Sequence, residues 1–401
     1  GPQGKVAIGF MFGVTLMLFG FKYAKKNIVG GGAIHVIGAI VIIITTYLAR
    51  QPAYNLFDPY FATILMFLTT VCIALTAYAY DRAPLAHVGL LLAGIIPMLT
   101  NTESNDFTGL LIYLGIVTLG VLWLALVTKW RTLVLLALSI VCVYSLLKIS
   151  GATGVTTVSF TECYLLAVFG ILFYVTSLFS ILRGSGKTGI VDGFVALLNA
   201  GYALMWIISQ MSHELAPLVI AVLGLVYVVG FFFVYKVTDV YTSFIIYGGI
   251  AFGLLTTAIM METSGRTLTL LLVMMGAGAT VFTQYLSKDK DVTKIVAFIN
   301  ILPAFYVFNS IIAIQRAIDF PTFRVDVWKD LLIVGLATAI YFSLYAFFAE
   351  KIKELSYVSL GAGVLLVVIS VWEVLHLMID GIFATALSLL VIGVGLTLFT
   401  Y

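Results

Sequence analysis

The sequence has few charged residues for its length. Of its 401 residues only 10% are Asp, Glu, Lys or Arg, while 62% are hydrophobic. Its mean hydropathy is +1.15. A soluble globular protein carries roughly 25% charged residues, because its surface must be hydrated. Most of this surface must therefore face lipid, which excludes a soluble enzyme, a nucleic-acid-binding protein and a disordered scaffold.

Cysteine and net charge are also scarce. Cys72, Cys142 and Cys163 are scattered through apolar runs, with neither metal-ligand spacing nor an obvious disulfide pairing. The net charge of +3 is too small to imply a polyanionic partner. We therefore expect no metal, no cofactor and no nucleic acid, with membrane lipids as partners and envelope proteins or a second copy of the chain as further candidates.

Long apolar runs separated by short polar turns fill the chain. A membrane-spanning helix needs about 20 mostly apolar residues, because its backbone polar groups must be satisfied internally. Fifteen such runs lie approximately at 5–22, 28–48, 58–80, 84–100, 108–128, 132–148, 160–182, 189–209, 216–235, 240–260, 267–286, 294–314, 328–349, 356–378 and 383–401. Membrane β-strands alternate in polarity, whereas these runs are apolar on every side. The sequence predicts an all-α, polytopic membrane bundle of about fifteen spans.

Basic residues are unevenly distributed over the connections. Those that follow odd-numbered spans hold 14 Lys and Arg residues, and the others, with the N-terminal tip, hold 7. Because Lys and Arg concentrate on the cytoplasmic side, the odd connections are expected in the cytoplasm of a bacterial-type inner membrane, and the N-terminus outside. A chain that starts outside without Met and stops within the run at 383–401 is expected to be an internal piece of a longer protein, with 1–401 forming a single transmembrane domain.

Three stretches carry a resemblance to a known family. They are residues 1–21, which begin with Gly-Pro; residues 77–100, where a helix follows Tyr80-Asp81 and ends in a turn that contains Pro97; and residues 112–139, with a basic-Trp-basic hinge at Lys129, Trp130 and Arg131. They resemble the predicted bacterial membrane proteins known as domain of unknown function 2339. The similarity is fair over residues 1–150 and weak over the rest of the chain. One departure is Ala93-Gly94, where the family usually has Gly-Gly. The resemblance implies a membrane architecture and transfers no catalytic residues.

The run at 356–378 contains the leading candidate site. Glu373, His376 and Asp380 stand at i, i+3 and i+7, which is one face of a helix. Ionisable residues within spans usually face the bundle interior and mark proton or substrate paths. An alternative interpretation has equal weight. In it, Glu373 and His376 form a hydrogen-bonded pair that fixes helix packing, and Asp380 caps the turn at Gly381.

Asp192 and Asn199 form a second candidate pair. They are seven residues apart on one helix face, near the expected cytoplasmic start of the span at 189–209. A carboxylate near a helix N-terminus is stabilised by the helix dipole, so a structural role is favoured over a functional one.

Asn300, Pro303 and Asn309 interrupt the run at 294–314. Broken helices line substrate cavities in many transporters. Proline kinks without such a role are also common in spanning helices, and this interpretation is favoured here.

Small residues and isolated histidines are expected to serve packing. The glycine triplet at 30–32 suits a close helix contact. His35 and His87 stand alone within apolar runs, and each is expected to be a hydrogen-bonded packing residue rather than a ligand.

Three classes of function remain open. A transporter, flippase or channel for an envelope-related or amphiphilic substrate ranks first. A structural or assembly scaffold of the cell envelope ranks second, and an integral-membrane enzyme acting on a lipid-linked substrate, with Glu373 and His376 as acid and base, ranks third. Internal repeats would favour a transporter. No convincing repeat is evident in the individual spans.

Overall fold

The protein is all-α throughout its described part. The computed structural model describes residues 1–52, 54–100, 107–150, 159–183, 189–237, 241–287, 293–294, 307, 310–313 and 327–378. Its long helices are α1 (Pro2–Tyr23), α2 (Ile28–Arg50), α3 (Pro59–Ala79), α4 (Ala83–Thr100), α5 (Phe107–Thr128), α6 (Thr132–Ile149), α7 (Phe160–Arg183), α8 (Gly189–Gln210), α9 (Ala216–Val237), α10 (Tyr241–Glu262), α11 (Gly265–Ser287), α14 (Val327–Phe348) and α15 (Lys353–Met378). Within these residues 13 helices are long and apolar enough to cross a membrane. The all-α polytopic prediction is confirmed, and the expected spans at 294–314 and 383–401 lie largely or wholly outside the described residues.

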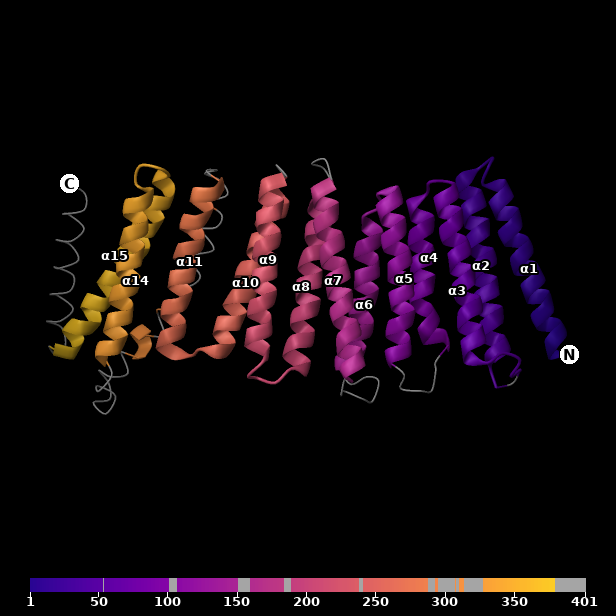
Figure 1. Ribbon diagram of the computed structural model, residues 1–401, viewed down its shortest axis with the longest axis horizontal. Coiled ribbons are helices and arrows are strands. Elements are labelled where there is room, and N and C mark those ends of the chain that lie inside the picture. The colour runs from indigo at the N-terminus through magenta and orange to yellow at the C-terminus, as the bar shows by residue number, and fades with distance from the viewer. Residues whose placement is uncertain are drawn as a thin grey trace. The chain divides into compact units, whose positions relative to one another are not determined.

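The chain groups into two compact units. The first unit comprises Gly1–Ser212 and Leu225–Ala251, and the second comprises His213–Gly224 and Phe252–Tyr401. In the first unit, the largest group of buried apolar side chains comes mainly from α5 and α6, with smaller shares from α7 and α8. In the second, the side chains of α14 pack with α11 and α15. Successive helices from α1 to α8 run in alternating directions (Figure 1).

Local sequence sets where helices begin. Asn27 accepts a hydrogen bond from the Gly30 amide at 3.1 Å ahead of α2. Asp58 accepts one from the Phe61 amide at 2.8 Å ahead of α3, whose first residue is Pro59. Side-chain caps satisfy the free amides of a first helical turn, and proline fits its first position. Both helices therefore start where the sequence supplies a cap.

Pro97 lies inside α4 instead of in the turn that the family resemblance implied, and the helix continues to Thr100. Proline cannot donate to the carbonyl four residues earlier, which here is that of Ala93. The Tyr113 hydroxyl donates to that carbonyl at 2.8 Å, and the Tyr144 hydroxyl donates to the neighbouring Gly94 carbonyl at 2.6 Å. Two tyrosines from α5 and α6 thus provide hydrogen bonds beside the proline and tie α4 to both helices.

Replacing Tyr113 with Phe is expected to reduce the free energy of unfolding by about 1 kcal/mol, because the Ala93 carbonyl loses its donor in a water-poor region. The measurement is denaturant unfolding of the purified chain in detergent. Tyr60, which is 70% exposed, offers a matched control, and Tyr60→Phe should change nothing measurable. Equal effects of the two substitutions would contradict this account of the proline.

Candidate functional site

The polar face predicted on the last described helix is only partly visible. Helix α15 extends through Glu373 and His376 to Met378, so the two residues are one turn apart on a continuous helix. Their side chains lie outside the described structure, as do residues Asp380, Asn300 and Asn309. The acid-base and broken-helix interpretations of these five residues stay predictions.

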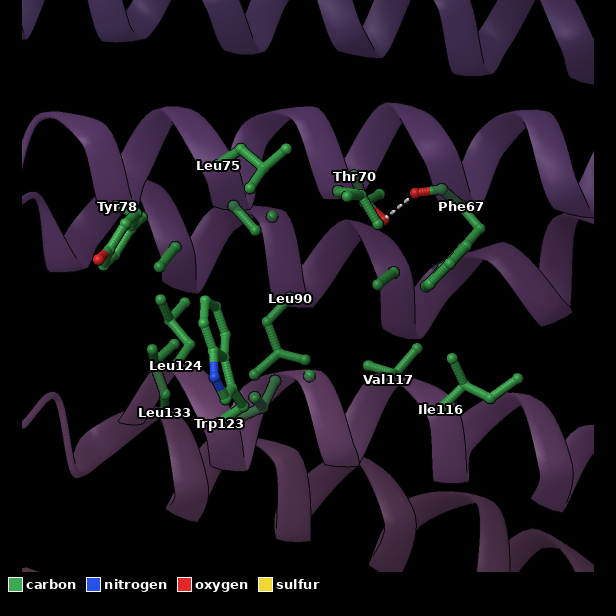
Figure 2. Close-up of a pocket in the computed structure, with 17 residues that line it drawn as sticks. Phe67, Thr70, Leu75, Tyr78, Leu90, Ile116, Val117, Trp123, Leu124 and Leu133 are labelled. Carbon is green, nitrogen blue, oxygen red and sulfur yellow. Dashed lines mark hydrogen bonds between the residues drawn. The ribbon is translucent and has the colours of Figure 1, made fainter. Parts of the chain in front are cut away.

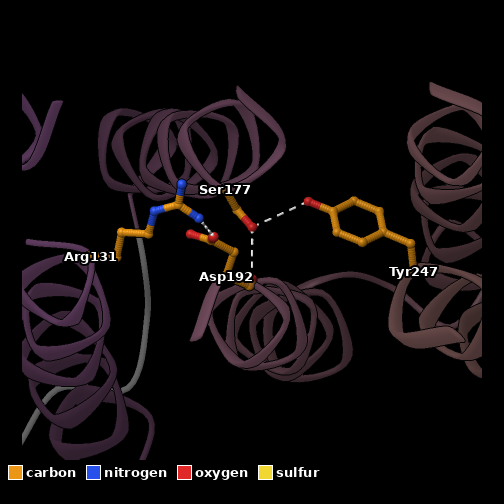
Figure 3. A network of polar contacts seen from close by, with 4 residues as sticks. All are labelled: Arg131, Ser177, Asp192 and Tyr247. Atoms are coloured by element: carbon orange, nitrogen blue, oxygen red, sulfur yellow. Dashed lines mark hydrogen bonds and ion pairs between the residues drawn. The ribbon is translucent and has the colours of Figure 1, made fainter. Parts of the chain in front are cut away.

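Asp192 forms a buried ion pair with Arg131 (Figure 3). Asp192 lies in the first turn of α8, and Arg131 directly precedes α6. The Asp192 side chain is 5% exposed and that of Arg131 is 15% exposed. A carboxylate in a first helical turn is favoured by the helix dipole, and the guanidinium adds a charge-assisted hydrogen bond. Asp192 thus has the structural role expected for it and a specific partner, Arg131, at the start of another helix.

Two further hydroxyl groups extend the contacts of Asp192. The buried Ser177 hydroxyl of α7 donates to the Asp192 backbone carbonyl at 2.8 Å. The Tyr247 hydroxyl of α10 donates to Ser177 Oγ at 3.2 Å. Figure 3 shows these groups in line from Arg131 to Tyr247. The start of α8 is therefore held by the α5–α6 connection on one side and by α7 and α10 on the other.

Asn199 does not join this network. Its side-chain amide donates to the Gly170 carbonyl of α7 at 2.9 Å. Its buried Oδ1 atom has no hydrogen-bond partner in the described structure. Asp192 and Asn199 lie on one helix, as expected, but they contact different elements and do not form one site.

The second unit contains an ion pair that the sequence reasoning missed. Arg266, in the first turn of α11, binds Asp330, in the first turn of α14, through two hydrogen bonds. The Nε–Oδ1 distance is 2.9 Å and the Nη2–Oδ2 distance is 2.6 Å. Asp330 is 4% exposed and Arg266 36% exposed. Each unit therefore contains an arginine that pairs with an aspartate in the first turn of a helix.

The two arginines stand in nearly the same sequence. Residues 128–136 read TKWRTLVLL and residues 263–271 read TSGRTLTLL, so that Thr, Arg-Thr-Leu and Leu-Leu recur in the same order. This match is the signal that could have revealed Arg266. It reveals an internal repeat that is not apparent from the individual spans.

The repeat extends on the N-terminal side of both arginines. Residues 107–116 (FTGLLIYLGI) match residues 241–250 (YTSFIIYGGI), and Ala-Pro-Leu occurs at 83–85 and at 216–218. The matched stretches lie at the starts of corresponding helices: α4 corresponds to α9, α5 to α10 and α6 to α11. Each is about 135 residues from its counterpart, which defines a repeat of five helices.

An apolar pocket opens between α3, α4 and α5 of the first unit (Figure 2). Its volume is about 220 Å³. Leu75, Leu90, Trp123 and Leu124 line it, and its Thr70 hydroxyl donates to the Phe67 carbonyl of its own helix at 2.7 Å. Its lining is mostly apolar, with Tyr78 adding a phenol hydroxyl, so the pocket is suited to an acyl chain.

The two histidines at spanning depth have partners for both ring nitrogens. His35 contacts the Met17 carbonyl at 2.9 Å and Thr76 Oγ1 at 3.2 Å. His87 contacts the Ala83 carbonyl at 2.7 Å and Thr132 Oγ1 at 2.9 Å. Both fit the packing role expected for them. Among the described residues no group of three His, Cys, Asp or Glu side chains could hold a metal ion.

Comparison with known proteins gives one match. The model of a family described as "Predicted membrane protein (DUF2339)" matches residues 1–401. No curated protein and no solved structure matches the chain.

Proposed function

We propose that this chain, which belongs to the DUF2339 family of predicted membrane proteins, is a transporter, flippase or channel for an amphiphilic, envelope-related substrate. The proposed location is a bacterial-type inner membrane. The proposal is supported by the pocket among α3, α4 and α5, whose mostly apolar lining suits the apolar part of such a substrate. One observation, the five-helix repeat, favours transport over a scaffold or a lipid-modifying enzyme.

The repeat favours transport because of its odd number of helices. Each spanning helix reverses the direction of the chain, so helices five apart, such as α6 and α11, cross the membrane in opposite senses. Inverted repeats of this kind occur in many transporter folds, where the two copies open in turn toward opposite sides. A scaffold has no such need for inverted copies.

Under this proposal, the two ion pairs belong to opposite membrane faces. The excess of Lys and Arg in the odd connections favours an outside N-terminus, which assigns Arg131–Asp192 to the cytoplasmic face and Arg266–Asp330 to the outer face. Each pair joins the starts of two helices. We propose that each pair holds its own face closed and separates when that face opens.

Cysteine labelling tests this proposal with two equivalent positions. Thr128 and Thr263 each precede the paired arginine by three residues, and both are half-buried. In a chain whose native cysteines are replaced by Ser, Thr128→Cys and Thr263→Cys are labelled separately with a membrane-impermeant maleimide. In intact cells we expect Thr263→Cys to react and Thr128→Cys to react only after permeabilisation.

Breaking one pair should have opposite effects at the two faces. Asp192→Asn should raise labelling of Thr128→Cys at least about threefold and lower that of Thr263→Cys, and Asp330→Asn should do the reverse, because a two-state protein shifts as a whole. General unfolding would raise both rates. A change confined to the mutated face would favour the scaffold and contradict the proposed transport.

A further inference from the structure

Four buried hydrogen-bond donors lie together at one end of the first unit. Ser145 and Lys148 lie on α6, and Tyr202 and Trp206 lie on α8. Spacings of three and four residues place each pair on one face of its helix. The exposed fractions are 0% and 3% on α6, and 3% and 7% on α8. These two helices pack against each other.

Three of these four groups make no hydrogen bond of normal geometry within the described structure. The Tyr202 hydroxyl lies beside the Ser145 and Trp206 side chains. Nevertheless, Ser145 Oγ, Tyr202 OH and Trp206 Nε1 are buried without a hydrogen-bond partner of normal geometry. Lys148 Nζ lies 5.0 Å from the ring centre of Phe107, whose ring is 6.4 Å from that of Trp206. No described carboxylate lies within ion-pair distance of Lys148.

A partner that accepts hydrogen bonds and carries negative charge would satisfy all four groups. Buried polar groups without partners are rare, and a buried ammonium without a counter-charge costs more than a neutral donor. Lysine and the tryptophan ring can only donate, and serine and tyrosine hydroxyls can donate as well. We propose that Lys148, Ser145, Tyr202 and Trp206 form a binding site for an anionic oxygen group, a phosphate or a carboxylate, between α6 and α8.

The position of these residues along their helices fits this ligand. Lys148 is the last residue but one of α6, Trp206 lies about one turn before the end of α8, and Phe107 is the first residue of α5. Ends of spanning helices lie at the level of lipid headgroups, where basic and aromatic side chains gather. The anionic group can come from an acidic lipid or from a soluble anion, because both reach this level.

Thermal unfolding of the full chain, followed by tryptophan fluorescence, separates the two sources. One arm titrates inorganic phosphate at constant ionic strength. The other compares nanodiscs of phosphatidylglycerol with nanodiscs of phosphatidylcholine. A ligand that binds only the folded state raises the midpoint, and we expect a rise of about 3 °C or more in one arm. A response to phosphate identifies a soluble anion, and a response only to phosphatidylglycerol identifies a lipid headgroup.

Substitutions then assign the effect to this site. Lys148→Met should weaken binding at least about tenfold, and Lys148→Arg should retain most of it. Tyr202→Phe removes one donor and no charge, so it keeps the test usable if Lys148→Met does not fold. Lys22, an exposed lysine in the last turn of α1, provides the control, and Lys22→Met should bind as the unchanged chain does. No response in either arm, or a response that survives both Lys148→Met and Tyr202→Phe, would overturn the site. Because binding is measured without transport, failure here leaves the proposed function standing, and the reverse holds.

Discussion

Replacing Asp192 with Asn is expected to lower the free energy of unfolding by about 3 kcal/mol, because the Arg131 guanidinium, which is 15% exposed, loses its only carboxylate within the described structure. The substitution preserves the size of the side chain, and the backbone carbonyl at 192 still accepts the hydrogen bond from Ser177. The loss of stability therefore comes from the loss of the negative charge. Denaturant unfolding of the purified chain in detergent measures the loss.

A double substitution distinguishes charge burial from simple packing. Arg131→Met combined with Asp192→Leu removes both charges, and it should be less destabilising than Asp192→Asn alone, because no buried charge is left without a partner. Asp58 is the matched control, since Asn caps a helix as well as Asp does, and Asp58→Asn should stay within about 0.5 kcal/mol. If Asp192→Asn proves as mild as Asp58→Asn, then solvent screens the pair and it cannot hold a face closed.

The fold could be predicted from the sequence because lipid imposes one requirement along the whole chain. Every backbone group at membrane depth must be paired within its own helix, so each apolar run of sufficient length becomes a helix. Breaks were predictable where local chemistry decides them, as at Asn27 and Asp58. The family resemblance implied a turn at Pro97, but the helix continues there because tyrosines far away in sequence, at 113 and 144, donate to the neighbouring carbonyls.

The ion pairs illustrate what single spans cannot reveal. The sequence predicts Asp192 as a carboxylate in a first helical turn, and the structure places it there. From the sequence, Arg131 is a cytoplasmic charge in a basic hinge and Arg266 is an outer charge. A charge at the end of a span looks the same whether it is solvated or paired with a helix elsewhere. The similarity of the two arginine motifs carries information about pairing that no single span contains.

The contact between α1 and α2 shows the same limit at finer scale. The triplet Gly30–Gly32 indicated a close helix contact, and the structure has one. A Cβ atom on Gly31 would lie 2.2 Å from the Ala24 backbone nitrogen, and one on Gly20 would lie 2.4 Å from that of His35. The sequence could not say which member of the triplet faces the neighbouring helix, because that depends on how α2 is rotated against α1.

Gly31→Ala is therefore expected to lower the free energy of unfolding by at least about 3 kcal/mol relative to Gly32→Ala. Non-bonded carbon atoms need about 3.5 Å, and the atoms that crowd the new methyl group at Gly31 belong to backbone that cannot rotate away. At Gly32 the nearest atom is Leu85 Cδ1 at 4.0 Å, so alanine fits there and its higher helix propensity adds up to about 1 kcal/mol. Both substitutions add the same methyl group to the same helix, so propensity cancels in the comparison. Unfolding in detergent gives the two values, and equal values would mean that α1 and α2 do not approach as closely as 2.2 Å implies.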